Sequence, residues 1–287
     1  MEKVLKIYEN RKVFYGISIV LIMIGMISWA VKGLNYGTEF RGGTLIDIKI
    51  NADYNIEDIR EIANKYDDKA DARAVEGKEV NITSSTLKPT EINRLVADIK
   101  AKYPKAELME SNNIGPSVGK ELRQKALISS IAAVIGILIY ITLRFELKSG
   151  LAAIVALAHD VLITVGVYAV FQVPVNSSFI AAILTILGYS INDTIVVFDR
   201  IRENKSYGRY KNNPGMLIDA SITQTMARSI NTMMTTLFTI TAVYVLGVPS
   251  VKEFAFPLII GIISGGYSSI FIASPLWVTF EGKKKFA

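Results

Sequence analysis

Residues 151–172 read LAAIVALAHDVLITVGVYAVFQ, and residues 173–198 continue as VPVNSSFIAAILTILGYSINDTIVVF. Each stretch is long enough to cross the hydrocarbon core of a bilayer, which takes about 20 predominantly apolar residues as an α-helix. Pro174 and Asn176, at the junction of the two stretches, are residues that favour a turn. The sequence therefore predicts two antiparallel membrane-spanning helices joined by a short connection.

Four more apolar stretches of similar length make six in all, and they lie at 13–31, 126–143, 229–248 and 254–280. The whole chain of 287 residues is 51% hydrophobic and only 20% charged, with a mean hydropathy of +0.34. Soluble domains carry nearer a quarter of charged residues. The first stretch is too long for the apolar region of a signal peptide and lacks a cleavage site of small residues. We therefore expect a polytopic α-helical membrane protein with six transmembrane helices, the first of them a permanent anchor.

The distribution of lysine and arginine predicts the orientation of these helices, because cytoplasmic loops carry an excess of both residues. Outside the segment 32–125, the basic residues other than Lys252 fall in four pieces that we expect to be cytoplasmic: 1–12, 144–150, 199–228 and 281–287. Both termini are then cytoplasmic. Anionic lipid headgroups attract such a surface, so the net charge of +6 is explained by membrane lipids as partners, without nucleic acid.

The segment 32–125 holds as many acidic as basic residues, which indicates a translocated soluble domain. Alternating apolar residues predict strands, and apolar residues at helical spacing predict amphipathic helices. The order is strand 43–50, helix 55–66, strands 72–75 and 79–84, helix 90–103 and strand 106–111. This βαββαβ order predicts a small extracytoplasmic α+β domain of the ferredoxin-like kind between the first two membrane helices.

Three ionisable residues fall in or at the ends of the apolar stretches, where such side chains are costly and are functional by default. Asp193 and Arg228 each lie about 27 Å below the outer end of their helix, and Asp160 about 18 Å, at a rise of 1.5 Å per residue. Asp193 and Arg228 are therefore level with each other near the cytoplasmic edge. Supporting polar residues lie beside the three: His159, Asn192, Asn231, Thr232 and Thr235.

The polar residues beside Asp193 and those that follow Arg228 would form two stripes at matching depth, one on each helix. Together they could line a hydrated crevice in which Asp193 binds and releases protons. Desolvation and a neighbouring guanidinium act on such a carboxylate in opposite directions. Simpler interpretations remain open: Arg228 could reach lipid phosphates, Asp193 could be a structural hydrogen-bond partner, and His159 with Asp160 could be a packed polar pair. The threonines could serve helix packing alone.

Several classes of protein are excluded by what the sequence lacks. The chain has no cysteine and one histidine, so it offers no disulfide, no thiolate and no multi-histidine metal site. An intramembrane aspartyl protease would need two aspartates at one depth, whereas Asp160 and Asp193 differ by about 9 Å. Gly42 and Gly43 lack the ending of a phosphate-binding loop and are typical of a turn. We expect no enzymatic activity, no cofactor and no metal.

Five motifs give the chain a resemblance to a known family. The stretch GYSINDTIVVFDRIRE at 188–203 is the longest and most specific of them. LAHDV at 157–161, ARSINT at 227–232, GLNYGTEFRGG at 33–43 and IGPSVGKEL at 114–122 agree with it in order. Together they cover essentially the whole chain, which resembles the SecF family of bacterial protein-export membrane subunits.

The resemblance implies a fold of the resistance-nodulation-division superfamily and an obligate partner, SecD, that supplies six further spans. Six spans without an internal repeat agree physically with half of a two-half transporter. The family assists the SecYEG channel and the SecA motor, and uses proton-motive force to promote preprotein export across the bacterial cytoplasmic membrane. By resemblance, Asp193 and Arg228 fall on positions of its proton pathway, and Asp160 is a weaker assignment.

Two alternatives of other classes stay open at the level of sequence. One is a half-size exporter of lipids or small molecules from the same superfamily, although such exporters carry larger domains outside the membrane. The other is a passive scaffold that binds SecD and the translocase without proton coupling. A measurement of proton coupling separates the scaffold from the leading hypothesis.

Overall fold

The computed structural model describes residues 4–75, 78–144, 147–208, 210 and 213–281. Its contacts divide the chain into two compact units. We call residues 36–128 with 174–177 the sheet unit, and residues 4–35, 129–173 and 178–281 the helical unit. The expected tail beyond Glu281, at 282–287, lies outside the described residues, as do parts of the expected pieces 1–12, 144–150 and 199–228.

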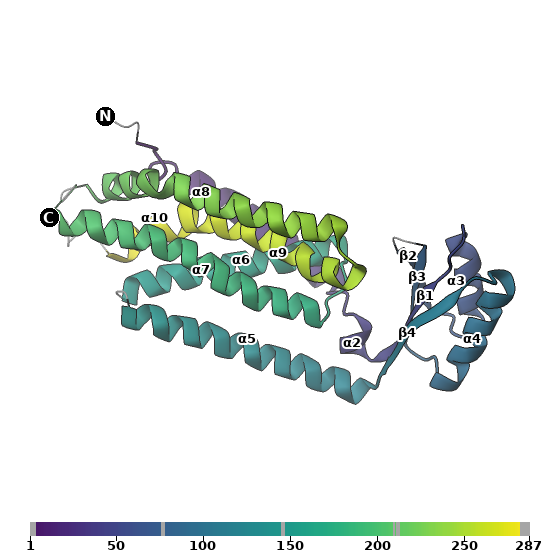
Figure 1. The fold of residues 1–287 in the computed structure, drawn as a ribbon. Coiled ribbons are helices and arrows are strands. Elements are labelled where there is room, and N and C mark those ends of the chain that lie inside the picture. The colour runs from purple at the N-terminus through teal and green to yellow at the C-terminus, as the bar shows by residue number, and fades with distance from the viewer. Residues whose placement is uncertain (1–3, 76–77, 145–146, 209, 211–212, 282–287) are drawn as a thin grey trace. The chain divides into compact units, whose positions relative to one another are not determined.

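The sheet unit contains a four-stranded antiparallel sheet in the order β2-β3-β1-β4. Its strands are β1 (Gly43–Lys49), β2 (Asp71–Val75), β3 (Glu79–Ser84) and β4 (Glu107–Ile114), and its helices include α3 (Ile56–Asn64) and α4 (Pro89–Lys102). This is the predicted βαββαβ arrangement, with β1 between β3 and β4. Figure 1 shows α3 and α4 on one side of the sheet.

Buried side chains alternate with more exposed ones along β1 and β3, and the buried ones form the core of the sheet unit. Ile46, Ile48 and Ile82 are fully or almost fully buried. They belong to the same core cluster as Ile59 of α3 and Leu95 of α4. Asn55 caps the first of these helices, as predicted, because its side chain accepts the Glu57 amide at 3.0 Å. The last strand begins and ends later than the predicted 106–111, and its side chains are exposed, so apolar alternation could not mark its end.

The two glycines after α2 (Thr38–Arg41) are required by the backbone. Gly42 has a φ of 81° and ends this short helix, and Gly43 has a φ of 142°. A Cβ atom on Gly43 would lie 2.5 Å from the carbonyl oxygen of Ser84 on β3. The glycines therefore let the chain turn and enter the centre of the sheet at once, as the turn interpretation of the sequence expected.

Six helices of the described chain are long and apolar enough to cross a membrane. They are α1 (Arg11–Lys32), α5 (Pro116–Arg144), α6 (Leu147–Phe171), α7 (Ser177–Ser206), α8 (Pro214–Leu246), and α9 (Pro249–Ser268) continued by η1 (Ser269–Ala273) and α10 (Ser274–Glu281). Much of the expected connection 199–228 is helical, because α7 runs on to Ser206 and α8 begins at Pro214. Asn213 caps α8 by accepting the Met216 amide.

The helical unit is organised around α6, which packs against α1 and α9. In Figure 1 these helices form a bundle with α7 and α8. Small residues permit the contact of α1 with α6: a Cβ atom on Gly25 would lie 2.5 Å from the Cα atom of Gly166. Close packing of this kind is how membrane helices associate in the absence of a hydrophobic driving force.

We expect Gly25→Leu to force α1 away from α6 and to destabilise the helical unit by about 1–3 kcal/mol, the usual cost of overpacking. Gly16→Leu is the matched control, because Gly16 lies on the same helix with no atom within 4 Å of a built Cβ. Thermal unfolding in detergent measures both. Equal midpoints for the two variants would contradict the packing described.

A buried aspartate stabilises the sheet unit in a pH-dependent way. Burial raises the pKa of Asp67, but hydrogen bonds from the Ser84 hydroxyl and the backbone of Lys69 and Thr86 outweigh it and hold the pKa at about 2. The carboxylate is 2.5 Å from the Ser84 oxygen. A lowered pKa means that this stabilisation is present above the unfolded value near 4 and disappears as the pH falls towards 2.

Asp67→Asn should therefore destabilise the sheet unit by about 1–2 kcal/mol at pH 7, and by progressively less as the pH approaches 2. Hydrogen exchange of the β3 amides in the full chain, corrected for intrinsic rates at pH 7 and pH 3, measures the difference. A loss of protection that is the same at both pH values would show that the charge of Asp67 contributes nothing.

Candidate functional site

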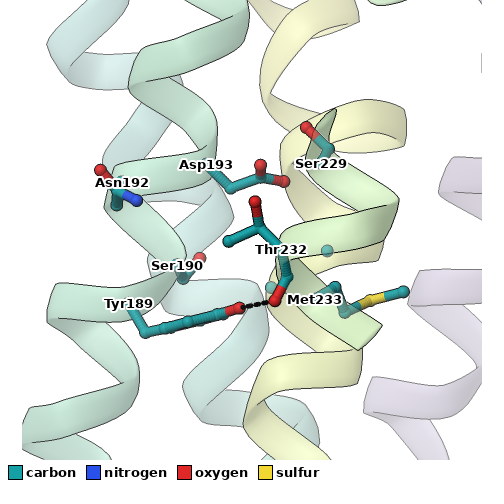
Figure 2. A pocket seen from close by; sticks show the side chains of 9 residues that line it. Tyr189, Ser190, Asn192, Asp193, Ser229, Thr232 and Met233 are labelled. Carbon is teal, nitrogen blue, oxygen red and sulfur yellow. Dashed lines mark hydrogen bonds between the residues drawn. The ribbon is translucent and has the colours of Figure 1, made fainter. Parts of the chain in front are cut away.

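Asp193 lines a small cavity between α7, α8 and α9, with a volume of about 10 Å³. Its other lining residues are Tyr189, Ser190, Asn192, Ser229, Thr232, Met233, Gly265 and Gly266. Figure 2 shows the Asp193 carboxylate between α7 and α8, directed towards Ser229 and Thr232. The carboxylate is half-buried within the apolar length of α7, where an ionisable side chain is functional by default.

Gly265 and Gly266 of α9 form the third side of this cavity. A Cβ atom on Gly265 would lie 3.0 Å from the Cβ atom of Ser190, and one on Gly266 would lie 2.5 Å from the sulfur of Met233. These side chains from α7 and α8 therefore occupy the space that larger residues on α9 would take.

Tyr189 joins α7 to α8 at the cavity wall. Its hydroxyl donates to the backbone oxygen of Thr232 at 3.1 Å (Figure 2). It also lies 3.1 Å from the hydroxyl oxygen of Thr236. The Thr232 and Thr236 hydroxyls donate to backbone oxygens one turn back, at Arg228 and Thr232. Much of the threonine stripe of α8 is thus satisfied within its own helix.

The predicted polar residues around Asp193 divide into two groups. Asn192 and Thr232 line the cavity with Asp193. Arg228, Asn231 and Thr235 are exposed on α8. Among the described residues, no ion pair joins the Arg228 guanidinium to Asp193; the arginine lies next in sequence to Ser229, whose side chain lines the cavity. Of the predicted polar residues of α8, only Thr232 therefore lines the cavity with Asp193 and Asn192.

Asp160 lies elsewhere in the helical unit and is fully buried. Its Oδ1 atom accepts a hydrogen bond from the Ser264 hydroxyl at 2.7 Å and lies 3.0 Å from Nδ1 of His159. Its Oδ2 atom accepts the hydroxyls of Ser190 at 2.6 Å and Ser268 at 2.8 Å. Four contacts from α6, α7 and α9 thus satisfy both oxygens, which is what a buried carboxylate requires.

His159 extends this cluster to α1. Its Nε2 atom is 3.0 Å from the hydroxyl of the buried Ser18. The ring of Tyr267 stacks on the imidazole with centroids 5.9 Å apart. When Nδ1 of His159 donates to Asp160, Nε2 accepts from Ser18, and the neutral ring is fully satisfied. The pair interpretation of His159 and Asp160 therefore describes their geometry, within a larger network.

Sequence reasoning missed the serines of both sites. Ser190 lines the cavity and also donates a hydrogen bond to Asp160. Ser264 and Ser268, which also donate to Asp160, lie one helical turn apart on α9. Ser229 lies on the cavity wall. The four-residue spacing of Ser264 and Ser268 was a signal, because it places both on one helix face. Among the described residues, no group of three or more histidine and acidic side chains is placed to bind a metal.

Comparisons with known proteins place these features in a family. The family model "Protein export membrane protein SecD/SecF, C-terminal" matches residues 95–283, and the model "SecD/SecF GG Motif" matches residues 27–52. The second range contains Gly42 and Gly43. Two similar relatives are named protein translocase subunit SecF. The one from Dictyoglomus turgidum is 40% identical, with 93% of each chain covered; the one from Sebaldella termitidis is 38% identical, with 98% of this chain and 93% of the relative covered.

The fold is also similar to two crystal structures of SecDF, a translocon-associated membrane protein. The structure from Thermus thermophilus has a TM-score of 0.89 at 32% identity, and the super-membrane-facing form has a TM-score of 0.74 at 32% identity. They cover 98% and 99% of this chain, but the chain spans only 39% and 40% of those longer proteins. On the family model, the relatives and the fold together, the chain belongs to the SecF family of bacterial protein translocase subunits.

Proposed function

We propose that this chain, together with SecD, uses proton-motive force to promote preprotein export through the SecYEG channel with the SecA motor. The observation that carries the proposal is the cavity at Asp193, which holds an ionisable side chain at membrane depth beside buried hydroxyls. A carboxylate in such a place can bind and release a proton. Similarity to SecF subunits and to SecDF supports the same conclusion.

The proposed proton pathway comprises Asp193, Arg228 and Asp160. Asp193 would bind the proton in the cavity, and the exposed cation of Arg228 would favour its charged form when the two approach. Asn192, Asn231, Thr232, Thr235 and His159 would support these groups. The membrane potential would drive the proton, with about 2.3 kcal/mol available per charge per 100 mV.

The exposed polar face of α8 supports SecD as the partner. Arg228, Asn231 and Thr235 are exposed in this chain, yet polar side chains in membrane helices normally face protein or a water-filled cavity. In contrast, α5 exposes Ile131, Ile135 and Ile139, which suit lipid. We infer that the helices of SecD cover the α7–α8 face, while the other surface meets bilayer lipids.

The proposed setting is the cytoplasmic membrane of a bacterium, with both termini in the cytoplasm. A multi-pass membrane protein is supported by the six apolar helices and the family. The cytoplasmic orientation of the termini rests on the excess of lysine and arginine in the segments 1–12, 144–150, 199–228 and 281–287. The sheet unit would then lie on the far side, where a preprotein emerges.

Asp193→Asn tests the coupling, because asparagine keeps the shape of the side chain and cannot carry the proton. We expect preprotein translocation into vesicles containing SecD to lose the part that depends on an imposed proton gradient, while SecD binding persists. Asp199→Asn is the matched control, since Asp199 lies on the same helix in an exposed ion pair with Arg202. Export that keeps its full gradient dependence in Asp193→Asn would identify the chain as a scaffold.

Single cysteines test the partner face, since the natural chain has none. We expect a membrane-permeant maleimide to label Thr235→Cys in the chain alone and to label it several-fold more slowly when SecD is present. Gly136→Cys on the exposed side of α5 is the control and should react equally in both cases. Protection at position 136, with none at 235, would place the partner elsewhere.

A further inference from the structure

Ser190 lies where the two polar sites of the helical unit meet. It is 1% exposed, and its hydroxyl donates to Oδ2 of Asp160 at 2.6 Å. The same residue lines the cavity that holds Asp193. The two residues are three positions apart on α7, which places them on neighbouring turns of one helix face. Figure 2 shows Ser190 in the wall of the cavity, on the turn next to Asp193.

The cavity has the size and the lining that hold a water molecule. Its volume of about 10 Å³ is roughly that of one water site. The hydroxyl of Ser229, a buried residue of its wall, lies beside the Asp193 carboxylate but forms no hydrogen bond of good geometry among the described residues. A buried polar atom without a partner is rare in proteins and commonly marks an ordered water. Asp193, Ser190 and Thr232 supply further polar groups around such a water.

We propose that Ser190 and one water in this cavity form a proton relay between Asp193 and the buried pair of His159 and Asp160. The relay deepens the proposed function, on which its role in export rests. In this relay, the Ser190 hydroxyl positions Oδ2 of Asp160 and transfers the proton to it. It also makes His159 and Asp160 a second proton-holding site, rather than an isolated structural cluster.

Each transfer moves one proton and changes no oxidation state. Protonated Asp193 gives its proton to the water, the water passes one to the oxygen of Ser190, and Ser190 releases its own hydroxyl proton to Oδ2 of Asp160. Asp193 becomes a carboxylate, and the pair gains one proton. The proton rests on Oδ2 of Asp160, beside a neutral imidazole whose Nδ1 still donates to Oδ1.

Uptake of the proton changes the net charge of the pair. A carboxylate beside a neutral imidazole leaves one net negative charge in a buried site, whereas the protonated pair is neutral and avoids that cost. Groups from three other helices face the pair, and all of those described are uncharged: Ser18 from α1, Ser190 from α7, and Ser264, Ser268 and Tyr267 from α9. Tyr267 is the titratable one, and its hydroxyl donates to the Phe14 backbone oxygen.

Ser268 provides a matched control for Ser190. Both hydroxyls donate to the same oxygen of Asp160, at 2.8 and 2.6 Å, and both residues are buried. Ser190 lines the cavity and Ser268 does not. A serine that merely satisfies Asp160 would be as important at one position as at the other. A relay requires the hydroxyl at position 190 alone.

The chain's single histidine makes the test direct, because ¹⁵N-histidine labelling yields signals from His159 only. The full chain is placed in lipid nanodiscs, and nuclear magnetic resonance follows the exchange of the imidazole N–H protons with water. We expect Ser190→Ala to slow this exchange about tenfold or more, as the loss of one transfer step would, and Ser268→Ala to leave it within about twofold. Unchanged ¹⁵N shifts in each variant show that the cluster remains folded.

Equal effects of the two substitutions, or no effect of either, would overturn the relay. This readout needs no export, so it is independent of the proposed function. Normal exchange in Ser190→Ala together with loss of gradient-dependent export in Asp193→Asn would reject the relay alone. Slowed exchange in Ser190→Ala with export unaffected by Asp193→Asn would keep the relay and reject its use in translocation.

Discussion

The requirement that a buried carboxylate be fully satisfied governs the helical unit. Asp160 is completely enclosed, and each of its oxygens has two hydrogen-bonding neighbours. Leaving such a charge without partners would cost several kcal/mol. The side chains that prevent this come from α6, α7 and α9, and His159 carries the contact on to α1. The polar cluster therefore fixes which faces of four helices meet, while small residues such as Gly25 and Gly166 allow the approach.

The cavity at Asp193 differs from the Asp160 cluster in being incompletely satisfied. Its carboxylate is half-buried, and the neighbouring Ser229 hydroxyl forms no hydrogen bond of good geometry within the described chain. In the proposed relay, a proton reaches Asp193 through water, whereas it reaches Asp160 only through a hydroxyl that already donates to that carboxylate. Close to it, η1 interrupts the last membrane helix with a π-helical turn, directly after Ser268. Such turns occur frequently at functional sites, and this one lies where α9 contacts both carboxylate sites.

The sequence allowed most of the fold and the ionisable residues to be predicted, for a clear physical reason. Apolar length marks membrane helices, alternation marks the strands of the sheet unit, and charges such as Asp160 and Asp193 are too costly in a bilayer to be accidental. The serines were not predicted, since small polar residues in membrane helices also serve packing, and only their neighbours distinguish the two roles. The exposed strand β4 was misjudged in length because it has no apolar face.

The central claim is that the Asp193 cavity is a hydrated proton site connected to a buried carboxylate. Electron cryo-microscopy of the chain bound to SecD, at a resolution that shows ordered water, tests it most directly. The account predicts density for a water within hydrogen-bonding distance of Asp193, Ser229 and Ser190, enclosed by the partner. A dry cavity, filled by Met233 or by a SecD side chain and with Ser190 turned away from it, would contradict the account.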